Sequence, residues 1–131
     1  MRDVVRTRSV PQIIVSNADY ERLTDLASAS LERLPDVAKE LLAEMDRARV
    51  VDDAAVPANV VRMGSTVSFK SDDGHERTLK LVYPADESLD QHRISVMTPV
   101  GAALVGLAEG QSISWTARDG RRHELTVLKV T

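Results

Sequence analysis

The sequence predicts an α+β fold in which two helices precede an antiparallel β-domain. Apolar residues recur at helical spacing between residues 16 and 48, a proline-containing linker occupies residues 50–60, and apolar and polar residues alternate from residue 66 onwards. Helices and strands that are separated along the chain are typical of α+β proteins. We therefore expect a helical unit with its lead-in segment and linker at residues 1–56, and a β-domain at residues 57–131.

The first helix is expected to begin at Ser16, after a short apolar run at residues 11–15 that we interpret as an extended lead-in strand. The serine hydroxyl can accept a hydrogen bond from the first turn of a helix, and Asp19 occupies the position of the acidic partner in a capping box. Leu23 and Leu26 then recur at helical spacing. These residues predict an amphipathic helix with one apolar stripe.

The second helix is expected to begin at Pro35, because proline suits the first helical position and Asp36 suits the positively polarised first turn. Its apolar residues form one stripe: Ala38, Leu41, Leu42, Met45 and Ala48. Two amphipathic helices joined by a short connection normally pack antiparallel, so we predict a short coiled-coil hairpin. An arm of about 15 residues reaches roughly 20 Å. The hairpin is expected to project from the β-domain; alternatively, both stripes pack on a globular core.

The β-domain is predicted to contain five strands and one short helix. Apolar residues alternate with polar ones in five segments: 66–70, 78–81, 93–97, 112–116 and 122–130. Residues 71–74 and 119–120 have the composition of hairpin turns. Between the third and fourth strands, apolar residues from Pro99 to Leu107 share one helical face, which predicts a helix that covers the sheet.

Composition excludes several kinds of function. The net charge is −3, and residues 1–60 hold 8 Lys/Arg against 11 Asp/Glu, so the chain is no polycation built to hold nucleic acid directly. The chain has few aromatic residues, one Trp, two Tyr and one Phe, so a pocket with aromatic walls is not expected. The absence of cysteine excludes disulfides and thiolate chemistry. No apolar run could span a membrane and no signal-peptide pattern opens the chain, so we expect a cytoplasmic protein.

Few residues suggest chemistry. His75, His92 and His123 have no ligand partner at short spacing, so we predict no metal site, no cofactor and no catalytic residue. Glu32 and Asp36 lie near the expected hairpin tip, where two carboxylates could share Mg²⁺ with ligands of a partner; the alternative is that both are simply solvated. Three arginines, Arg118, Arg121 and Arg122, cluster at the second β-turn. They could contact phosphate or an acidic partner surface; the alternative is an ordinary solvated turn.

Several separated sequence segments resemble the GreA/GreB family of transcription elongation factors. Residues 94–107 are similar to the signature of the C-terminal domain, a strand of the form I-S-x-x-S-P followed by a helix of small residues, and residues 63–67 resemble the entry strand of that domain. Four further segments resemble the Rnk branch of the family, the regulators of nucleoside diphosphate kinase. These segments are residues 43–48, 81–85, 99–104 and 113–115. The likeness extends from about residue 11 to the end of the chain.

This resemblance implies an FKBP-like C-terminal domain that docks on RNA polymerase at the rim of the secondary channel, with the hairpin directed into the channel. Ser95, Met97, Thr98 and Pro99, at the corner between the third strand and the short helix, would contact the polymerase. The function so implied is that of a non-catalytic transcription regulator that competes with Gre-type factors. It would act as a monomer and meet nucleic acid only indirectly, through the polymerase.

The chain departs from the Gre pattern at two places. Gre factors carry an acidic tip on a much longer coiled coil, which reaches the polymerase active centre and promotes transcript cleavage, whereas here the arms are short and Glu32 and Asp36 match no Gre tip motif. Met97 stands where Gre factors tend to have a polar residue. Two alternatives stay open: a cleavage-stimulating factor that lends these two carboxylates to the polymerase's Mg²⁺, or a direct regulator of nucleoside diphosphate kinase. An FKBP-like shape does not by itself imply prolyl isomerase activity.

Overall fold

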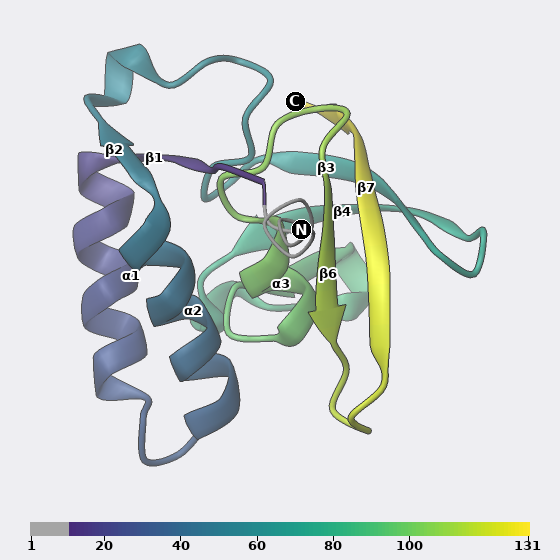
Figure 1. Cartoon of the computed structure of the whole chain (residues 1–131), viewed down its shortest axis with the longest axis horizontal. Helices are drawn as coiled ribbons and strands as arrows, with labels where there is room; N and C mark the ends of the chain where they lie inside the picture. The colour runs from purple at the N-terminus through teal and green to yellow at the C-terminus, as the bar shows by residue number, and fades with distance from the viewer. Residues whose placement is uncertain (1–10) are drawn as a thin grey trace, which may run out of the picture.

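The computed structural model describes residues 11–131 and places a helical hairpin beside a five-stranded sheet (Figure 1). Helix α1 spans Asn17–Ala29, helix α2 spans Pro35–Arg47, and the two run antiparallel. Strand β1 (Ile14–Ser16) pairs in parallel with β2 (Arg49–Val51), so the segments that enter and leave the hairpin are tied together. The lead-in strand is therefore confirmed, whereas β2 includes the first two residues of the expected linker, 50–51.

The large sheet contains the five predicted strands in the order β5-β4-β3-β7-β6. Their bounds are β3 (Thr66–Ser71), β4 (Glu76–Val82), β5 (Arg93–Ser95), β6 (Ser112–Thr116) and β7 (Arg122–Val130). Strands β4 and β5 pair in parallel, so the sheet is mixed and the expectation of an antiparallel β-domain is wrong for this pair. The reason lies in the connection between them, where two 3-10 turns, η3 (Pro84–Asp86) and η4 (Leu89–Gln91), carry the chain back before β5 begins.

The helix on the sheet and the strand before it are both shorter than predicted. Strand β5 stops at Ser95, whose hydroxyl accepts a hydrogen bond from the Met97 N–H and turns the chain. Helix α3 covers Pro99–Leu104 and ends before Gly106, which has a φ of +85° that side chains rarely tolerate. The Gly106 carbonyl then accepts the Ile14 N–H at 3.1 Å, which attaches β1 to the chain that follows α3.

Both helices of the hairpin begin where the sequence predicts. The Ser16 hydroxyl accepts the Asp19 N–H at 3.1 Å and caps α1, and Pro35 occupies the first turn of α2. Asp19 does not close the expected capping box. Its carboxylate accepts instead from the backbone N–H of Met63, 44 residues further on, at 3.3 Å. The first turn of α1 is thereby joined to the β-domain.

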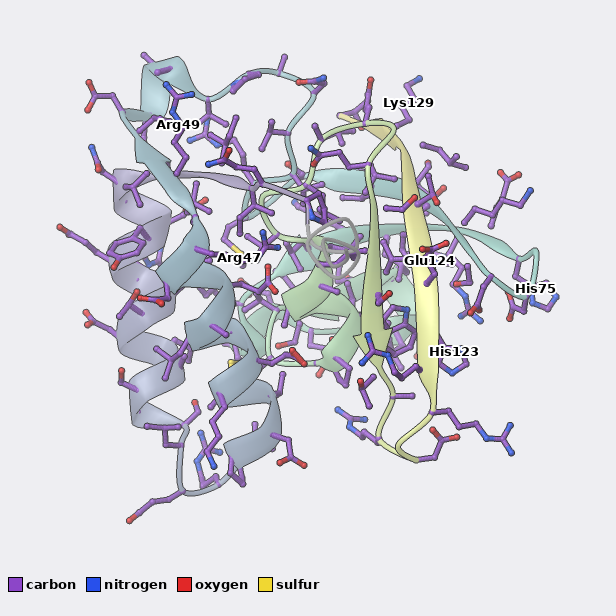
Figure 2. All side chains as sticks on the ribbon, in the orientation of Figure 1. Arg47, Arg49, His75, His123, Glu124 and Lys129 are labelled. Atoms are coloured by element: carbon purple, nitrogen blue, oxygen red, sulfur yellow. The ribbon has the colours of Figure 1, made fainter. Side chains whose placement is uncertain are left out.

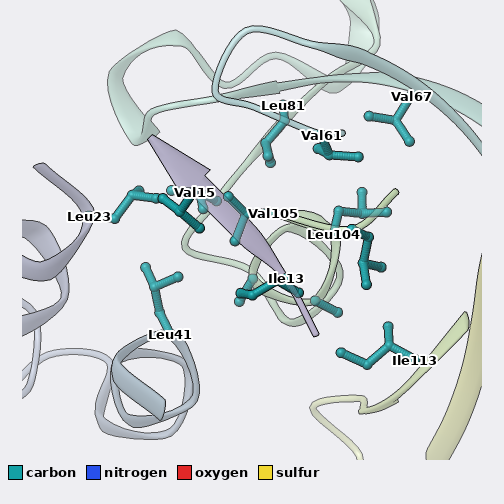
Figure 3. Packing of buried hydrophobic residues seen from close by; sticks show 14 of the residues in the cluster. Ile13, Val15, Leu23, Leu41, Val61, Val67, Leu81, Leu104, Val105 and Ile113 are labelled. Atoms are coloured by element: carbon teal, nitrogen blue, oxygen red, sulfur yellow. The ribbon is translucent and has the colours of Figure 1, made fainter. Parts of the chain in front are cut away.

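One hydrophobic core extends from the hairpin to the sheet (Figure 3). The buried stripe residues of the two helices are Leu23, Ala27, Ala38, Leu41 and Met45. Figure 3 shows Leu23 and Leu41 directed at Ile13 and Val15 of the lead-in segment, with Val105 beyond them. The expectation of a projecting hairpin is therefore wrong, and its alternative, packing on a globular core, describes this structure. Helices of 13 residues are marginal in isolation, so this burial stabilises them.

Candidate functional site

The corner between β5 and α3 holds the four residues that the sequence singles out for docking. Ser95 and Met97 are buried, with exposed fractions of 3% and 5%, whereas Thr98 and Pro99 are half-buried. The accessible part of the corner is therefore made by Thr98 and Pro99. Ser95 and Met97 determine its shape from beneath the surface.

Hydrogen bonds hold this corner in one conformation. The Thr98 hydroxyl donates to the Ser95 carbonyl at 2.7 Å and accepts the Gly101 N–H at 3.1 Å, which caps α3. The Ser95 N–H donates to the Glu87 carboxylate at 3.3 Å. Gly101 lies so close to β5 that a β-carbon there would stand 2.1 Å from the Ser95 carbonyl oxygen. The small residues of α3 thus permit a helix to start immediately against the end of a strand.

On one side of Pro99 lies a groove of about 760 Å³, which we call the hairpin groove. It separates the start of α2 from the β6–β7 turn, and its lining includes Leu34, Asp36, Met97, Pro99 and Arg118. The structure therefore brings Asp36 of the hairpin tip and Pro99 of the candidate docking corner to one surface. No periodicity in the sequence could have predicted this juxtaposition, since the two lie in separate halves of the chain.

On the other side of Pro99 lies a second groove of about 910 Å³, which we call the Leu89 groove. Its apolar lining is formed by Leu89, Ile94, Pro99, Val100 and Trp115, and its charged lining by Glu87, Asp90 and Arg118. Sequence reasoning missed the Leu89 side of this surface. The one sequence signal was a single leucine within the polar stretch Glu-Ser-Leu-Asp-Gln. Exposing a leucine to solvent does not stabilise the chain.

The carboxylates of the hairpin tip are accessible. Glu32, in the turn between the helices, and Asp36, in the first turn of α2, are both exposed. Within residues 11–131 no group of three or more His, Asp or Glu side chains is placed to hold a metal ion. Any ion bound at the tip would therefore need ligands from a partner.

The histidines do not form a site. His75 contacts Asp73 at 3.1 Å in the β3–β4 turn, whereas His123 lies on β7 between the Trp115 ring and Asp72. Figure 2 shows His75 and His123 well apart. The backbone and side-chain hydrogen bonds from His75 lower the pKa of the exposed Asp73 carboxyl. Both contacts are made to the β3–β4 turn, one from within the turn and one from β7, and these two histidines contact different carboxylates.

Side chains on both helices tie the hairpin to its neighbours. The Arg22 guanidinium lies 4.1 Å from the centre of the Tyr83 ring, at the end of β4. Burial raises the pKa of the Tyr83 hydroxyl, the Asp19 charge adds to the increase, and Arg22 opposes it. On α2, Arg47 pairs with Glu44 and donates to the Pro11 carbonyl; Figure 2 places Arg47 on the side of α2 that faces the sheet.

Comparison with known proteins agrees with this architecture. The model of the C-terminal part of the GreA/GreB transcription elongation factors matches residues 56–131, and the Rnk N-terminus model matches residues 11–51. A regulator of nucleoside diphosphate kinase from Escherichia coli (strain K12) is 40% identical over 123 residues, which cover 93% of this chain and 90% of the relative. A transcription elongation factor GreA from Rhodospirillum rubrum is 35% identical over 115 residues, or 86% and 71% of the two chains.

Among solved structures, a prokaryotic transcription elongation factor GreA/GreB from Nitrosomonas europaea is similar over 91% of this chain and 98% of its own, with a TM-score of 0.72 and 38% identity. No helix in residues 11–131 is long and apolar enough to cross a membrane. The two family models together account for the hairpin and the sheet, and the identity to Rnk extends through both. The chain therefore belongs to the Rnk branch of the GreA/GreB family of transcription elongation factors.

Proposed function

We propose that this protein is a non-catalytic regulator that binds RNA polymerase and competes with Gre-type factors for the rim of the secondary channel. Family membership supports a regulator of the transcription elongation type. In this proposal the protein is a cytoplasmic monomer that meets nucleic acid only through the polymerase. Its C-terminal half has the FKBP-like form expected of the family, and its hairpin acts as a short coiled coil that occupies the channel entrance.

The observation that carries this proposal is that Asp36 and Pro99 line the same groove. A factor that docks through Pro99 would therefore hold its hairpin tip close to the docking contact. Each helix has 13 residues, or about 20 Å at 1.5 Å per residue, and much of that length lies along the globular core. The hairpin can thus fill the channel entrance without extending deep into it.

The same geometry disfavours transcript cleavage. A carboxylate stabilises a hard cation only when its oxygen lies within about 2–2.6 Å of the ion. Glu32 and Asp36 would stay near the rim of the channel. Their side chains are too short to span a gap of several helical turns to a metal ion deeper in the channel. Occupancy of the channel, governed by mass action, is the mechanism that this arrangement supports.

The test is binding of the purified protein to core RNA polymerase, followed by competition with a GreA protein. We expect saturable binding, and a fall in GreA-stimulated cleavage as this protein is added. Pro99→Asp should weaken binding, because it places an unpaired charge at the centre of the contact. Met97 is buried, so its substitution by Asp would disrupt folding and is unsuitable as a docking test.

The same purified protein can be used to distinguish polymerase binding from direct regulation of nucleoside diphosphate kinase. Tagged protein should retain polymerase subunits from a lysate and from a purified mixture of polymerase and kinase. Retention of the purified kinase with no retention of purified polymerase would overturn the proposal in favour of that alternative.

A further inference from the structure

We propose that a third groove, on the edge of β4, binds a compact polyphosphate of the size of the di- or triphosphate group of a nucleotide. This groove has a volume of about 820 Å³, and we call it the Lys80 groove. Its charged lining includes Arg77, Lys80, Arg93 and Glu76. It shares no lining residue with the two grooves beside Pro99, so this inference goes beyond the proposed function and does not depend on polymerase binding.

The Lys80 groove follows the edge of β4 that β5 leaves uncovered. Strand β5 pairs only with residues 80–82 of β4, so residues 76–79 have no partner strand on that edge among the described residues. On the same edge the Lys80 N–H donates to the His92 carbonyl at 2.8 Å. Because N–H groups alternate between the two edges of a strand, the Thr78 N–H points to this side as well. It is therefore a backbone donor directed toward the groove.

Two cations lie side by side in this groove. Lys80 and Arg93 are partners in the β4–β5 pairing, so their side chains leave the same face of the sheet. Within residues 11–131 neither forms an ion pair, and the half-buried Arg93 has no hydrogen-bond partner for its buried Nε atom. Like charges on neighbouring strands repel each other, and a half-buried guanidinium with unused donors is costly. An anion bound between the two side chains would offset both costs.

The turn before β5 holds Arg93 beside Lys80. His92 has a φ of +58°, and within residues 11–131 it is the one non-glycine residue with a positive φ. This left-handed conformation costs free energy in a residue that has a β-carbon. Two backbone hydrogen bonds fix it, one from the His92 N–H to the Leu89 carbonyl at 3.1 Å and one from the Lys80 N–H to the His92 carbonyl. The chain thus keeps a strained turn that preorganises the two cations.

The lining of the groove favours a compact phosphate over other anions. It contains three cations and one carboxylate, Glu76, which stands opposite Lys70 of β3, whereas the whole chain has a net charge of −3. A small positive region on a negative chain suits a small anion better than a long nucleic-acid backbone. The described lining has no Phe, Tyr or Trp, and Leu79 is its one aliphatic residue, so it offers little to a base or to the apolar anchor of a peptide. Arginine forks and backbone N–H groups both match phosphate oxygens.

The experiment measures binding of sodium tripolyphosphate to the full chain by calorimetry, at about 0.15 M salt and without divalent cations. Lys80→Gln and Arg93→Gln each remove one cation of the groove. Lys129→Gln is the matched control, because it removes an exposed lysine from β7, two strands from β4 and outside the groove (Figure 2). Two strands separate side chains by roughly 10 Å, beyond the Debye length of about 8 Å. Thermal unfolding without ligand shows whether each variant is folded.

We expect one site on the wild type and on Lys129→Gln, and about tenfold weaker binding by Lys80→Gln and Arg93→Gln. Without ligand, Lys80→Gln should unfold at the temperature of the wild type or above it, because the substitution relieves repulsion. Tripolyphosphate should raise the unfolding temperature of the wild type far more than that of this variant. ATP that binds as tightly as tripolyphosphate would support recognition of the phosphates alone, and tighter binding of ATP would identify a nucleotide as their source.

The proposal is overturned if tripolyphosphate does not bind the wild type, or if it binds both groove variants equally well. Citrate that binds as tightly as tripolyphosphate would also overturn it, in favour of an acidic protein partner. A single-stranded oligonucleotide that binds more tightly than tripolyphosphate, with the same dependence on Lys80, would replace the compact ligand by nucleic acid. RNA polymerase is absent from all of these measurements, so their failure leaves the proposed function untouched.

Discussion

Ile13 lies directly against Gly106: a β-carbon at residue 106 would stand 2.7 Å from the Ile13 β-carbon. Ile13 is fully buried, and the next residue, Ile14, donates its N–H to the Gly106 carbonyl at 3.1 Å. This contact joins the segment before the hairpin to the chain that leaves α3. The hairpin and the sheet are therefore attached at a point where only glycine fits.

Gly106→Ala should lower the free energy of unfolding by roughly 2–4 kcal/mol, because it adds a clash with Ile13 to the cost of a positive φ in a non-glycine residue. Gly74→Ala is the matched control. Gly74 has a φ of +88° but no atom within 4 Å of its ideal β-carbon, so only the cost of the positive φ, about 1–2 kcal/mol, should appear. Urea denaturation measures the free energy of unfolding of both variants. Equal losses would show that the contact with Ile13 contributes nothing.

A chain that begins near Ala58 and lacks the hairpin should not unfold cooperatively, because the stripe residues of both helices complete the core of the sheet. Thermal unfolding monitored by circular dichroism, together with binding of a hydrophobic dye, tests this. Leu41→Ala in the full chain should cost about 2–5 kcal/mol, whereas Leu128→Ala, on the exposed face of β7, should cost far less. A sharp thermal transition in the truncated chain would show instead that the β-domain folds alone.

Glu44 should make stability depend on pH in an unusual direction for a carboxylate. Burial raises the pKa of this carboxyl above its usual 4.5, the bond and charge of Arg47 lower it, and the charge of Glu40 raises it slightly. A raised pKa means that the folded state favours the protonated form. The stabilising contribution is therefore fully present below about pH 4.5 and is lost as the pH rises through the higher folded-state pKa.

The measurement compares the wild type with Glu44→Gln by urea denaturation between about pH 4 and pH 7. The stability of the wild type relative to the variant should fall as the pH rises. Glu21→Gln, on the exposed side of α1, controls for the loss of a surface carboxylate. A relative stability that instead increases with pH would mean that the ion pair with Arg47 outweighs the effect of burial.

The protein alone should leave transcripts in a backtracked polymerase complex uncut, even at saturating concentration. The physical reason is that Asp36 and Pro99 line one groove, so a factor that docks through Pro99, as we propose, would hold Asp36 near the proposed contact. A GreA protein added to the same complex provides the positive control. Shortened transcripts that disappear when Glu32 and Asp36 are both replaced by Ala would contradict the prediction and support a cleavage-stimulating factor.

The sequence by itself determined the elements that depend on near neighbours. Ser16 and Pro35 mark the helix starts because an N-cap hydroxyl and a fixed φ act within one turn. The alternating residues of β3 and β7 mark strands because successive side chains point to opposite faces. The family signature around Pro99 is also local, so the sequence alone could single out this corner as a candidate docking site, which stays a prediction.

Only the tertiary structure decided how these elements meet. The parallel pairing of β4 with β5 depends on the path of residues 83–92, which have no periodicity. The burial of Met97 and the exposure of Leu89 depend on which neighbours cover each side chain. The apolar stripes of the two helices predict that each helix packs against another apolar surface. They do not specify which surface, because hydrophobic burial is non-directional. Packing against the lead-in strand and α3 supplies that surface, and it sets Asp36 and Pro99 around one groove.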